Sequence, residues 1–382
     1  MRIGMFADMY KPHISGVTNY VSLYKRRFEE LGHEVFVFTY GNESHHDDEA
    51  NVVRSPAIAW GDTGWQAGIR LSHEARALIP TMDIAHAHHP FLSGRVALRE
   101  CRPGNIPVVF TNHTRYDIYS DAYARFAPRP IRMAFLRSYL HSFAAEVDLV
   151  LAPSPGIRTW LSDFGITDSA VLHSNAVDTL PFTQPSDPRS PADFGWSPDS
   201  IVFCYLGRIG PEKNLDMLVD SFLILAAEEP RARLLLLGDG PGRGAAQEKL
   251  WANELTDRVH FAGRTSYDEV PDLLAAADAF VTASVSEVHP LVVMEAMAAG
   301  LPAVGVHSPG VGDIIKDGET GFLTTESPAE FAARMLDLAR DRGLRERMSA
   351  AARAASVEYD IRPMADRLLE RYEDLIAARR DG

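Results

Sequence analysis

The chain has 382 residues, of which 46% are hydrophobic and 24% charged, so it is long and apolar enough to bury the cores of two domains. Its net charge of −14 argues against broad nucleic-acid binding, and no apolar run approaches the roughly 18 residues that a membrane-spanning helix requires. An N-terminus without the features of a secretion signal and only two cysteines predict a protein of the reducing cytoplasm.

Apolar, β-branched runs alternate with helical patterns along the first half of the chain. Strands separated by helices form parallel sheets with right-handed crossovers, so residues 1–178 are predicted to form one α/β domain. One of its strands ends in His86, His88 and His89, which lack further ligands at metal spacing and are interpreted as lining a cleft or core. The strands are expected at residues 2–7, 34–40, 84–89, 107–113, 149–154 and 170–175.

Two segments of this half carry aromatic and basic residues outside the strand pattern. Trp60 and Trp65 lie in a predicted glycine-rich loop, which a buried core would not use. Residues 124–146 predict an amphipathic helix whose apolar side chains repeat at helical spacing, namely Ile131, Phe135, Leu136, Tyr139 and Phe143. This helix also has a basic bias from Arg125, Arg129, Arg132 and Arg137. It could lie on an anionic membrane surface, or it could bury its apolar stripe in the domain and leave the arginines in water.

The second half begins after a segment with the composition of a linker. Residues 179–195 are rich in proline, serine and aspartate, and we expect the domain boundary there. Residues 196–362 then repeat the alternation of strands and helices and are predicted to form a second α/β domain. Its strands are expected at residues 201–207, 233–239, 259–263, 279–284, 302–307 and 321–325.

The first strand of the second half leads into a basic loop. It ends at Gly207, and Arg208 and Lys213 follow before the next helix begins near Asn214 or Leu215. Open α/β sheets bind ligands at loops of this kind, at the carboxyl ends of parallel strands. The guanidinium fork of Arg208 and the ammonium group of Lys213 together suit a diphosphate. The alternative is two exposed basic residues in a turn.

Two glutamates with seven residues between them follow the fourth strand of this half. Glu287 is placed in a loop and Glu295 in a helix that begins near Pro290. The free amides of Leu291 and Val292 are predicted to face an anion, with Glu295 one turn further in. A phosphate there, with a hydroxyl-rich group on either side, indicates a sugar nucleotide. In the alternative, Glu287 caps the helix and Glu295 is a solvated surface residue.

These motifs, with the loop Ser15–Val17, the segment TNHT at residues 111–114 and the run GDGPG, resemble the retaining glycosyltransferases of the GT-B fold. The resemblance covers nearly the whole chain. It implies two Rossmann-like parallel-sheet domains that face each other across a cleft, residues 1–178 binding the acceptor and residues 196–362 the nucleotide sugar. It also implies that a final helix, about residues 363–382, packs back on the first domain.

The resemblance assigns roles to residues of the second domain. The two basic residues after Gly207 hold the donor diphosphate, Glu295 holds the ribose hydroxyls and Glu287 holds the transferred sugar. The base falls at Arg264 and Thr265. The chain departs from the family at His289 and Pro290, which replace a common Phe-Gly pair and remove one amide that could face the phosphate.

The resemblance also assigns roles to the first domain. Gly16, beside Val17, brings the backbone close to the distal phosphate, and His113 meets the sugar or the acceptor. Ser15 stands where many members have a second glycine, so the backbone approach beside Gly16 is expected to be tighter or reshaped. The segment TNHTRYDIYSDAY is similar to that of bacterial diacylglycerol glucosyltransferases.

The expected chemistry is retaining transfer of a hexose, with Arg208, Lys213 and the helix amides stabilising the leaving diphosphate. No metal or other cofactor is expected, since no Asp-x-Asp triplet is present. The leading interpretation is transfer of glucose from UDP-glucose to a lipid such as 1,2-diacylglycerol, by a protein peripheral to the inner face of the cell membrane. The membrane contacts would be Trp60, Trp65, Arg129, Arg132 and Arg137. The alternatives are another donor, such as GDP-mannose, with a soluble acceptor, or a non-catalytic sugar-nucleotide binding module. No nucleic-acid partner is expected, and the oligomeric state is not indicated.

Overall fold

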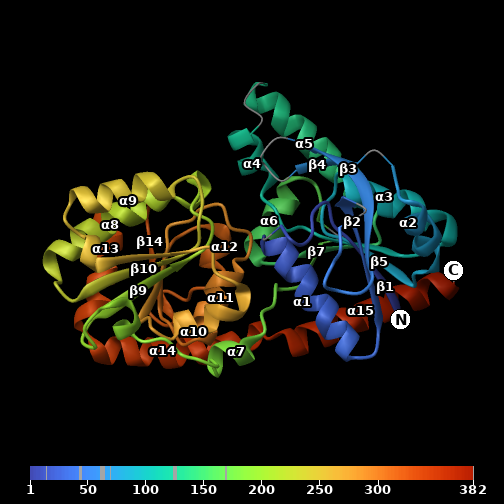
Figure 1. Cartoon of the computed structure of the whole chain (residues 1–382). Coiled ribbons are helices and arrows are strands. Elements are labelled where there is room, and N and C mark those ends of the chain that lie inside the picture. Colours follow the sequence, from blue (N-terminus) through green and yellow to red (C-terminus); the bar gives the residue numbers. More distant parts are fainter. Residues whose placement is uncertain are drawn as a thin grey trace. The chain divides into compact units, whose positions relative to one another are not determined.

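The computed structural model describes residues 1–13, 15–42, 45–60, 65–68, 70–123, 127–167 and 170–381. The chain divides into two compact units. The first comprises Met1–Asn175 and Ile361–Gly382, and the second comprises Ala176–Asp360. Each unit is built on one largely parallel sheet with helices packed against it (Figure 1).

The first unit holds an eight-stranded sheet in the order β4-β3-β2-β1-β5-β6-β7-β8. Its strands are β1 (Arg2–Phe6), β2 (Glu34–Gly41), β3 (Val52–Trp60), β4 (Trp65–Gly68), β5 (Ile84–Ala87), β6 (Val108–Thr111), β7 (Leu149–Ala152) and β8 (Ala170–Leu172). Its helices are α1 (Gly16–Glu30), α2 (His73–Leu78), α3 (Leu92–Cys101), α4 (Tyr116–Tyr123), α5 (Arg129–Ala144), α6 (Pro155–Asp163) and α15 (Ile361–Asp381), with short 3-10 turns η2 (Ile79–Thr81) and η3 (Arg102–Gly104).

The six strands predicted for this half are confirmed, but β3 and β4 were not predicted. Pro56 lies inside β3, and proline normally marks the edge or end of a strand. The sheet tolerates it because Pro56 is the last residue of β3 paired with β2, and pairing with antiparallel β4 begins at Ala57. Trp60 pairs with Trp65 across β3 and β4, so the backbone of both tryptophans is strand and the loop prediction was wrong for them. Their side chains lie outside the described part of the chain.

The second unit holds a six-stranded parallel sheet in the order β11-β10-β9-β12-β13-β14. All six strands predicted for this half are confirmed: β9 (Ile201–Leu206), β10 (Ala232–Leu237), β11 (Val259–Gly263), β12 (Ala279–Thr282), β13 (Ala303–Val306) and β14 (Gly321–Thr324). The helices are α7 (Thr179–Thr183), α8 (Leu215–Glu228), α9 (Arg243–Ala252), α10 (Val270–Leu274), α11 (Leu291–Ala298), α12 (Pro309–Gly312), α13 (Pro328–Arg340) and α14 (Arg342–Ser356). The 3-10 turns are η4 (Pro191–Phe194), η5 (Pro211–Lys213), η6 (Thr256–Arg258), η7 (Tyr267–Glu269) and η8 (Val357–Tyr359).

Side chains of the central strand β9 alternate between two buried layers. Phe203 packs with apolar residues of α8 and α13, whereas Val202 and Cys204 pack with those of α11. Because both faces of this parallel sheet are covered, its strands are apolar almost throughout. This largely apolar pattern is why the strands of this unit could be predicted.

The segment 179–195, predicted to be a linker, belongs to the second unit, whose boundary lies between Asn175 and Ala176. Phe182 on α7 is 3% exposed. The Asp272 carboxylate accepts hydrogen bonds from the Asp187 amide at 2.8 Å and from the Ser186 hydroxyl. Short helical turns and these bonds satisfy the backbone of the segment, although its composition is that of a linker.

The final helix, α15, packs against α1 in the first unit (Figure 1). Tyr372 on this helix is fully buried, and its hydroxyl lies 2.5 Å from Nδ1 of His86 at the end of β5. The chain therefore returns to the first unit through a helix that supplies part of its core.

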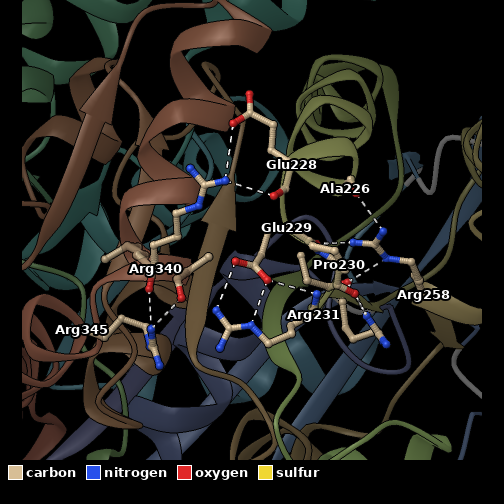
Figure 2. Close-up of polar contacts among 12 residues, drawn as sticks. Ala226, Glu228, Glu229, Pro230, Arg231, Arg258, Arg340 and Arg345 are labelled. Carbon is tan, nitrogen blue, oxygen red and sulfur yellow. Dashed lines mark hydrogen bonds and ion pairs between the residues drawn. The ribbon is translucent and has the colours of Figure 1, made fainter.

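Arginine side chains hold the C-terminal end of α8, as Figure 2 shows. The last carbonyl groups of an α-helix have no partner within the helix. The Arg258 guanidinium donates to three carbonyl oxygens, those of Ala226 at 2.8 Å, Glu229 at 2.6 Å and Ala232 at 3.1 Å. Arg340 on α13 donates to the Glu228 carbonyl oxygen at 3.0 Å. These bonds fix α8 to the start of β10 and to α13, and so hold the connection between β9 and β10.

Candidate active site

The order of the second sheet changes direction between β9 and β12. From β9 the chain continues to β10 and β11 on one side of the sheet, and from β12 to β13 and β14 on the other. In open α/β sheets, ligands bind outside the carboxyl ends of the strands at such a switch point. The loops that begin there are residues 207–214 after β9 and residues 283–290 after β12. They carry five of the predicted donor residues, namely Arg208, Lys213, Glu287, His289 and Pro290.

The loop after β9 is held by the loop after β10. The Gly207 amide donates to the carbonyl oxygen of Leu237, the last residue of β10, at 2.9 Å, and the Ile209 amide donates to that of Asp239 in the loop at 3.0 Å. Gly238 has a φ of +139°, and a side-chain carbon there would lie 1.9 Å from the Gly207 carbonyl oxygen. Gly240 has a φ of +157°, and a side-chain carbon there would lie 2.4 Å from the Ile209 carbonyl oxygen. Only glycine fits at these two positions, which explains the GDGPG run.

Lys213 and Glu287 pair with each other in the structure. The ammonium group of Lys213 donates to Glu287 Oε1 at 2.5 Å, and the two side chains are 23% and 19% exposed. The sequence assigned them to different parts of a ligand and did not predict this ion pair. Arg208 is 59% exposed, and its guanidinium contacts Glu212 at 3.3 Å. A diphosphate can therefore meet Arg208 directly, but it must compete with Glu287 for Lys213.

Glu295 lies one turn into α11 and is only 2% exposed. Burial raises the pKa of its carboxyl to about 7, although a hydrogen bond with Tyr267 acts in the opposite direction. Among the described residues no side chain caps the start of α11, whose first amides belong to Leu291 and Val292. The alternative of a helix-capping Glu287 and a solvated Glu295 is therefore wrong.

The loop after β11 carries the two residues assigned to the base. Arg264 is exposed, and the Thr265 hydroxyl donates to the Gly263 carbonyl oxygen at 3.3 Å. The same loop leads to Tyr267, which hydrogen-bonds Glu295. The sequence did not indicate Tyr267 as a site residue, because it sits in a polar turn whose only recognisable signal is the capping box of Ser266 and Glu269.

His289 and Pro290, which replace the common Phe-Gly pair of the family, have different structural roles. His289 is 4% exposed, and its ring packs against Tyr359 at a centroid distance of 5.7 Å. Burial lowers its pKa to about 3, so the ring is neutral near pH 7. Pro290 is the residue that precedes the first turn of α11. The imidazole of His289 is thus part of the core, while the backbone of the pair sets where the helix begins.

The first sheet has a switch point between β1 and β5. Ser15 is the N-cap of α1, and its hydroxyl accepts a hydrogen bond from the Thr18 amide at 3.1 Å. The serine that replaces a family glycine thus stabilises the helix start. Gly16 is exposed, with no atom within 4 Å of the place where a side-chain carbon would stand, and Val17 is partly exposed. The backbone at Gly16 is therefore open to a ligand.

His113 follows β6 and contacts other rings of the first unit. Its Nε2 lies 3.0 Å from Nδ1 of His88, and its ring meets the edge of Tyr20 at 4.6 Å. Burial, and then the neighbouring His89 and His86, hold the pKa of His113 well below its ordinary value. His86, His88 and His89 are buried, so their interpretation as core residues is supported. In the described ranges no group of three or more His, Cys, Asp or Glu could hold a metal ion.

The predicted amphipathic helix is α5, shorter than expected, and its apolar side chains are divided between core and surface. Leu136, Leu140 and Phe143 are buried, whereas Ile131 and Phe135 are 63% and 66% exposed. The predicted basic residues differ in their surroundings, and Arg125 lies outside the described residues.

The three described arginines of this helix all have partners. Arg129 and Arg132 pair with Asp121 at 3.0 and 2.8 Å, and the Arg132 side chain is only 12% exposed. The guanidinium of Arg137 lies 5.6 Å from the Phe164 ring. Arg132 therefore joins α5 to the end of α4 and is less accessible than the sequence predicted.

None of the helices in the described part of the chain has the length and apolar character of a membrane span.

Two protein-family models match the chain. The model described as Glycosyltransferase Family 4 matches residues 14–179, and the model described as Glycosyl transferases group 1 matches residues 186–355. The chain is 30% identical over 365 residues to the D-inositol 3-phosphate glycosyltransferase of Frankia alni, covering 88% of this chain and 89% of that protein. The chain belongs to the family 4 glycosyltransferases.

Two further proteins, one of known structure, are similar to the chain over most of its length. The family 4 chain is 28% identical over 337 residues to the alpha-monoglucosyldiacylglycerol synthase of Streptococcus pneumoniae, covering 85% of this chain and 75% of that protein. The crystal structure of Anabaena HepE in complex with UDP and glucose matches 98% of this chain and 100% of its own, with a TM-score of 0.77 and 21% identity. These similarities confirm the predicted GT-B fold and make the chain a hexosyltransferase.

The first prediction concerns the buried carboxyl of Glu295. Because its folded-state pKa lies near 7 and the ordinary value is 4.5, the stability that it contributes is fully present below pH 4.5 and is lost as the pH rises through 7. Between pH 5.5 and 8.5 the wild type should therefore lose about 2 kcal/mol of unfolding free energy relative to Glu295→Gln. Urea unfolding at the two pH values measures this, with the exposed Glu346→Gln as control. Parallel pH profiles for wild type and Glu295→Gln would contradict the assignment.

Proposed function

We propose that the chain transfers a hexose, with retention of anomeric configuration, from a nucleoside diphosphate sugar to a lipid acceptor such as 1,2-diacylglycerol. The donor part of this proposal is supported by the groups around the β9 and β12 switch point. An exposed Arg208, an ion-paired Lys213 and Glu287, and the uncapped start of α11 all lie on loops that begin there. UDP-glucose is the donor we favour, since HepE was solved with UDP and glucose and the pneumococcal relative is named as an alpha-monoglucosyldiacylglycerol synthase.

The proposed mechanism depends on charge that develops on the leaving diphosphate. Arg208 and the first amides of α11 would stabilise this charge, and Lys213 would join them once it has left Glu287. The acceptor hydroxyl attacks on the face from which the diphosphate leaves, and a phosphate oxygen accepts its proton. We expect no divalent metal, because cationic side chains and helix amides can supply the stabilisation for which other transferases use one.

The Lys213–Glu287 pair would change partners when the donor binds. Moving the Lys213 ammonium to the diphosphate frees the Glu287 carboxylate, which can then accept hydrogen bonds from hydroxyls of the transferred sugar. The same carboxylate would offset the positive charge at the anomeric carbon in the transition state. Separating this partly buried ion pair costs free energy. A ligand offsets that cost if it offers an anion to Lys213 and hydroxyl groups to Glu287. A sugar nucleotide offers both, whereas a free sugar offers only the hydroxyl groups.

Glu295 is proposed to hold the ribose. Ribose hydroxyls donate to a carboxylate, and such hydrogen bonds favour its ionised form. A carboxyl with a pKa near 7 would therefore lose its proton as the nucleotide binds. Arg264 and Thr265 are proposed to meet the base. His113 and the backbone at Gly16 and Val17 keep the roles that the family resemblance implies.

The acceptor half of the proposal is supported by the surface of α5. Ile131 and Phe135 are large apolar side chains that stand in solvent one turn apart, and Arg129 and Arg137 are exposed on the same helix. Apolar side chains flanked by arginines suit the interface of an anionic membrane. The protein would then dock on the cytoplasmic face of the membrane, where a lipid such as diacylglycerol is accessible. Similarity to the alpha-monoglucosyldiacylglycerol synthase points to the same acceptor class.

A soluble acceptor is the second candidate. The chain is 30% identical to a D-inositol 3-phosphate glycosyltransferase, and this relative is matched over 89% of its length. Every donor residue would keep its role with such an acceptor. The two candidates differ in the first unit alone, so membrane binding and acceptor choice distinguish them.

Substitution of either basic residue tests the donor site. Because Arg208 and Lys213 would stabilise charge that grows toward the transition state, Arg208→Ala or Lys213→Ala should lower turnover by roughly 10² to 10³. Steady-state release of nucleoside diphosphate measures this effect. Lys249→Ala is a matched control, since Lys249 makes ion pairs with Asp216 and Asp220 on α8 and is not among the residues proposed to bind the donor. Near wild-type turnover in Arg208→Ala and Lys213→Ala would contradict the assignment.

Substitution of the exposed apolar pair tests the acceptor. Vesicle binding should rise with the fraction of anionic lipid, fall with salt, and drop about tenfold or more in Ile131→Ser/Phe135→Ser, because apolar surface no longer enters the interface. Nucleotide binding should not change. The matched control is Trp251→Ser on α9, another large apolar side chain that is 48% exposed. Efficient transfer to inositol phosphate, with no vesicle binding at any lipid composition, would contradict the lipid acceptor and favour the soluble one.

A further inference from the structure

A stack of rings from three parts of the first unit surrounds His113. His88, at the end of β5, is fully buried, and its ring lies 4.3 Å from that of His86 and 5.5 Å from that of Tyr20. His86 is anchored on both sides, with Nδ1 at 2.5 Å from the Tyr372 hydroxyl and Nε2 at 2.7 Å from the Thr111 hydroxyl. The plane of the His88 ring is therefore set by packing against a side chain that has no freedom to turn.

The contact between His88 and His113 joins two ring nitrogens. Nδ1 of His88 lies 3.0 Å from Nε2 of His113, so one of the two nitrogens must carry a proton and the other must accept it. Burial holds the pKa of each ring well below its ordinary value, and each ring is therefore neutral near pH 7 with a single proton. Two arrangements are possible. Either His113 donates from Nε2 and His88 carries its own proton on Nε2, or His88 donates from Nδ1 and His113 carries its own proton on Nδ1.

The far nitrogen of His88 distinguishes the two arrangements. Nε2 of His88 is buried, and among the described residues it has no hydrogen-bond partner. If His113 were the donor, His88 would carry its proton on this nitrogen, and a buried N–H group would be left unpaired. If His88 is the donor, its Nε2 is unprotonated and carries a lone pair. A buried acceptor without a partner is tolerated better than a buried donor without one.

We propose that His88 is a positioning residue, protonated on Nδ1, which donates to Nε2 of His113 and so places the proton of His113 on Nδ1. Within the described residues Nδ1 of His113 has no hydrogen-bond partner, and the residue is partly exposed. His113 then offers an N–H group to an oxygen of the substrate, such as a sugar hydroxyl. It serves as a hydrogen-bond donor and not as a general base, because its other nitrogen is occupied by His88. This role in binding substrate rests on the proposed transferase function, whereas the tautomer itself does not.

The tautomer can be read directly on the full chain. Protein labelled with ¹⁵N-histidine, at pH 7.5 and without substrate, gives two-bond ¹H–¹⁵N correlations that distinguish a protonated from an unprotonated ring nitrogen, and His113→Phe identifies the His113 signals. We expect a protonated Nδ1 and an unprotonated Nε2 for His113. A His113 ring protonated on Nε2 in the wild type would overturn the proposal, whether or not the chain transfers a sugar.

Substitution of His88 tests its positioning role. His88→Phe keeps a ring against His86 and Tyr20 but removes the donor, so the His113 proton should move largely to Nε2 and turnover should fall about tenfold with little change in nucleotide affinity. His88→Asn restores an amide N–H near the place of Nδ1, and it should restore the wild-type tautomer and most of the turnover. His173→Phe is the matched control, since this buried histidine contacts Tyr24 and not His113. An unchanged His113 tautomer in His88→Phe would overturn the proposal. A wild type with the expected tautomer but no transferase activity would contradict the proposed function alone.

Discussion

The donor site depends on how closely the loop after β10 approaches the loop after β9. Gly238 and Gly240 permit backbone contacts that any side-chain carbon would block, and the amides of Gly207 and Ile209 are satisfied by that approach. The loop that carries the two cations is therefore fixed by backbone hydrogen bonds before any ligand binds. Preorganised charge of this kind is the form of electrostatic stabilisation that costs least at the transition state.

Several ionisable groups at the ends of both sheets are partly or fully buried, and their states depend on that burial and on their neighbours. Lys213 and Glu287 neutralise each other, Glu295 is left with a pKa near 7, and burial keeps His88 and His113 neutral. Removing Lys213 would leave Glu287 without its counter-ion, and removing His88 is expected to change the tautomer of His113. The function proposed for each residue is therefore a property of a pair, which is why single substitutions should be read together with their partners.

Much of the fold could be predicted from the sequence, because strands buried on both faces are apolar throughout and helices such as α11 begin at clear signals like Pro290. Strand β3 was missed because Pro56 interrupts it, and the segment 179–195 was taken for a linker because its packing around Phe182 leaves no mark on composition. The charged loops of the candidate site were predicted, since they follow strand ends. The pairing of Lys213 with Glu287, 74 residues apart, and the contact of Tyr267 with Glu295 were not, because they arise only when loops from different strands meet.

In the proposed donor complex, the loops at the β9 and β12 switch point hold one nucleoside diphosphate. A crystal structure of the chain with UDP is the decisive test. We expect the diphosphate in contact with Arg208, Lys213 and the amides of Leu291 and Val292, the Lys213–Glu287 ion pair broken, and the ribose hydroxyls on the Glu295 carboxylate. A nucleotide bound elsewhere, or a diphosphate bound while Lys213 remains paired with Glu287, would contradict it.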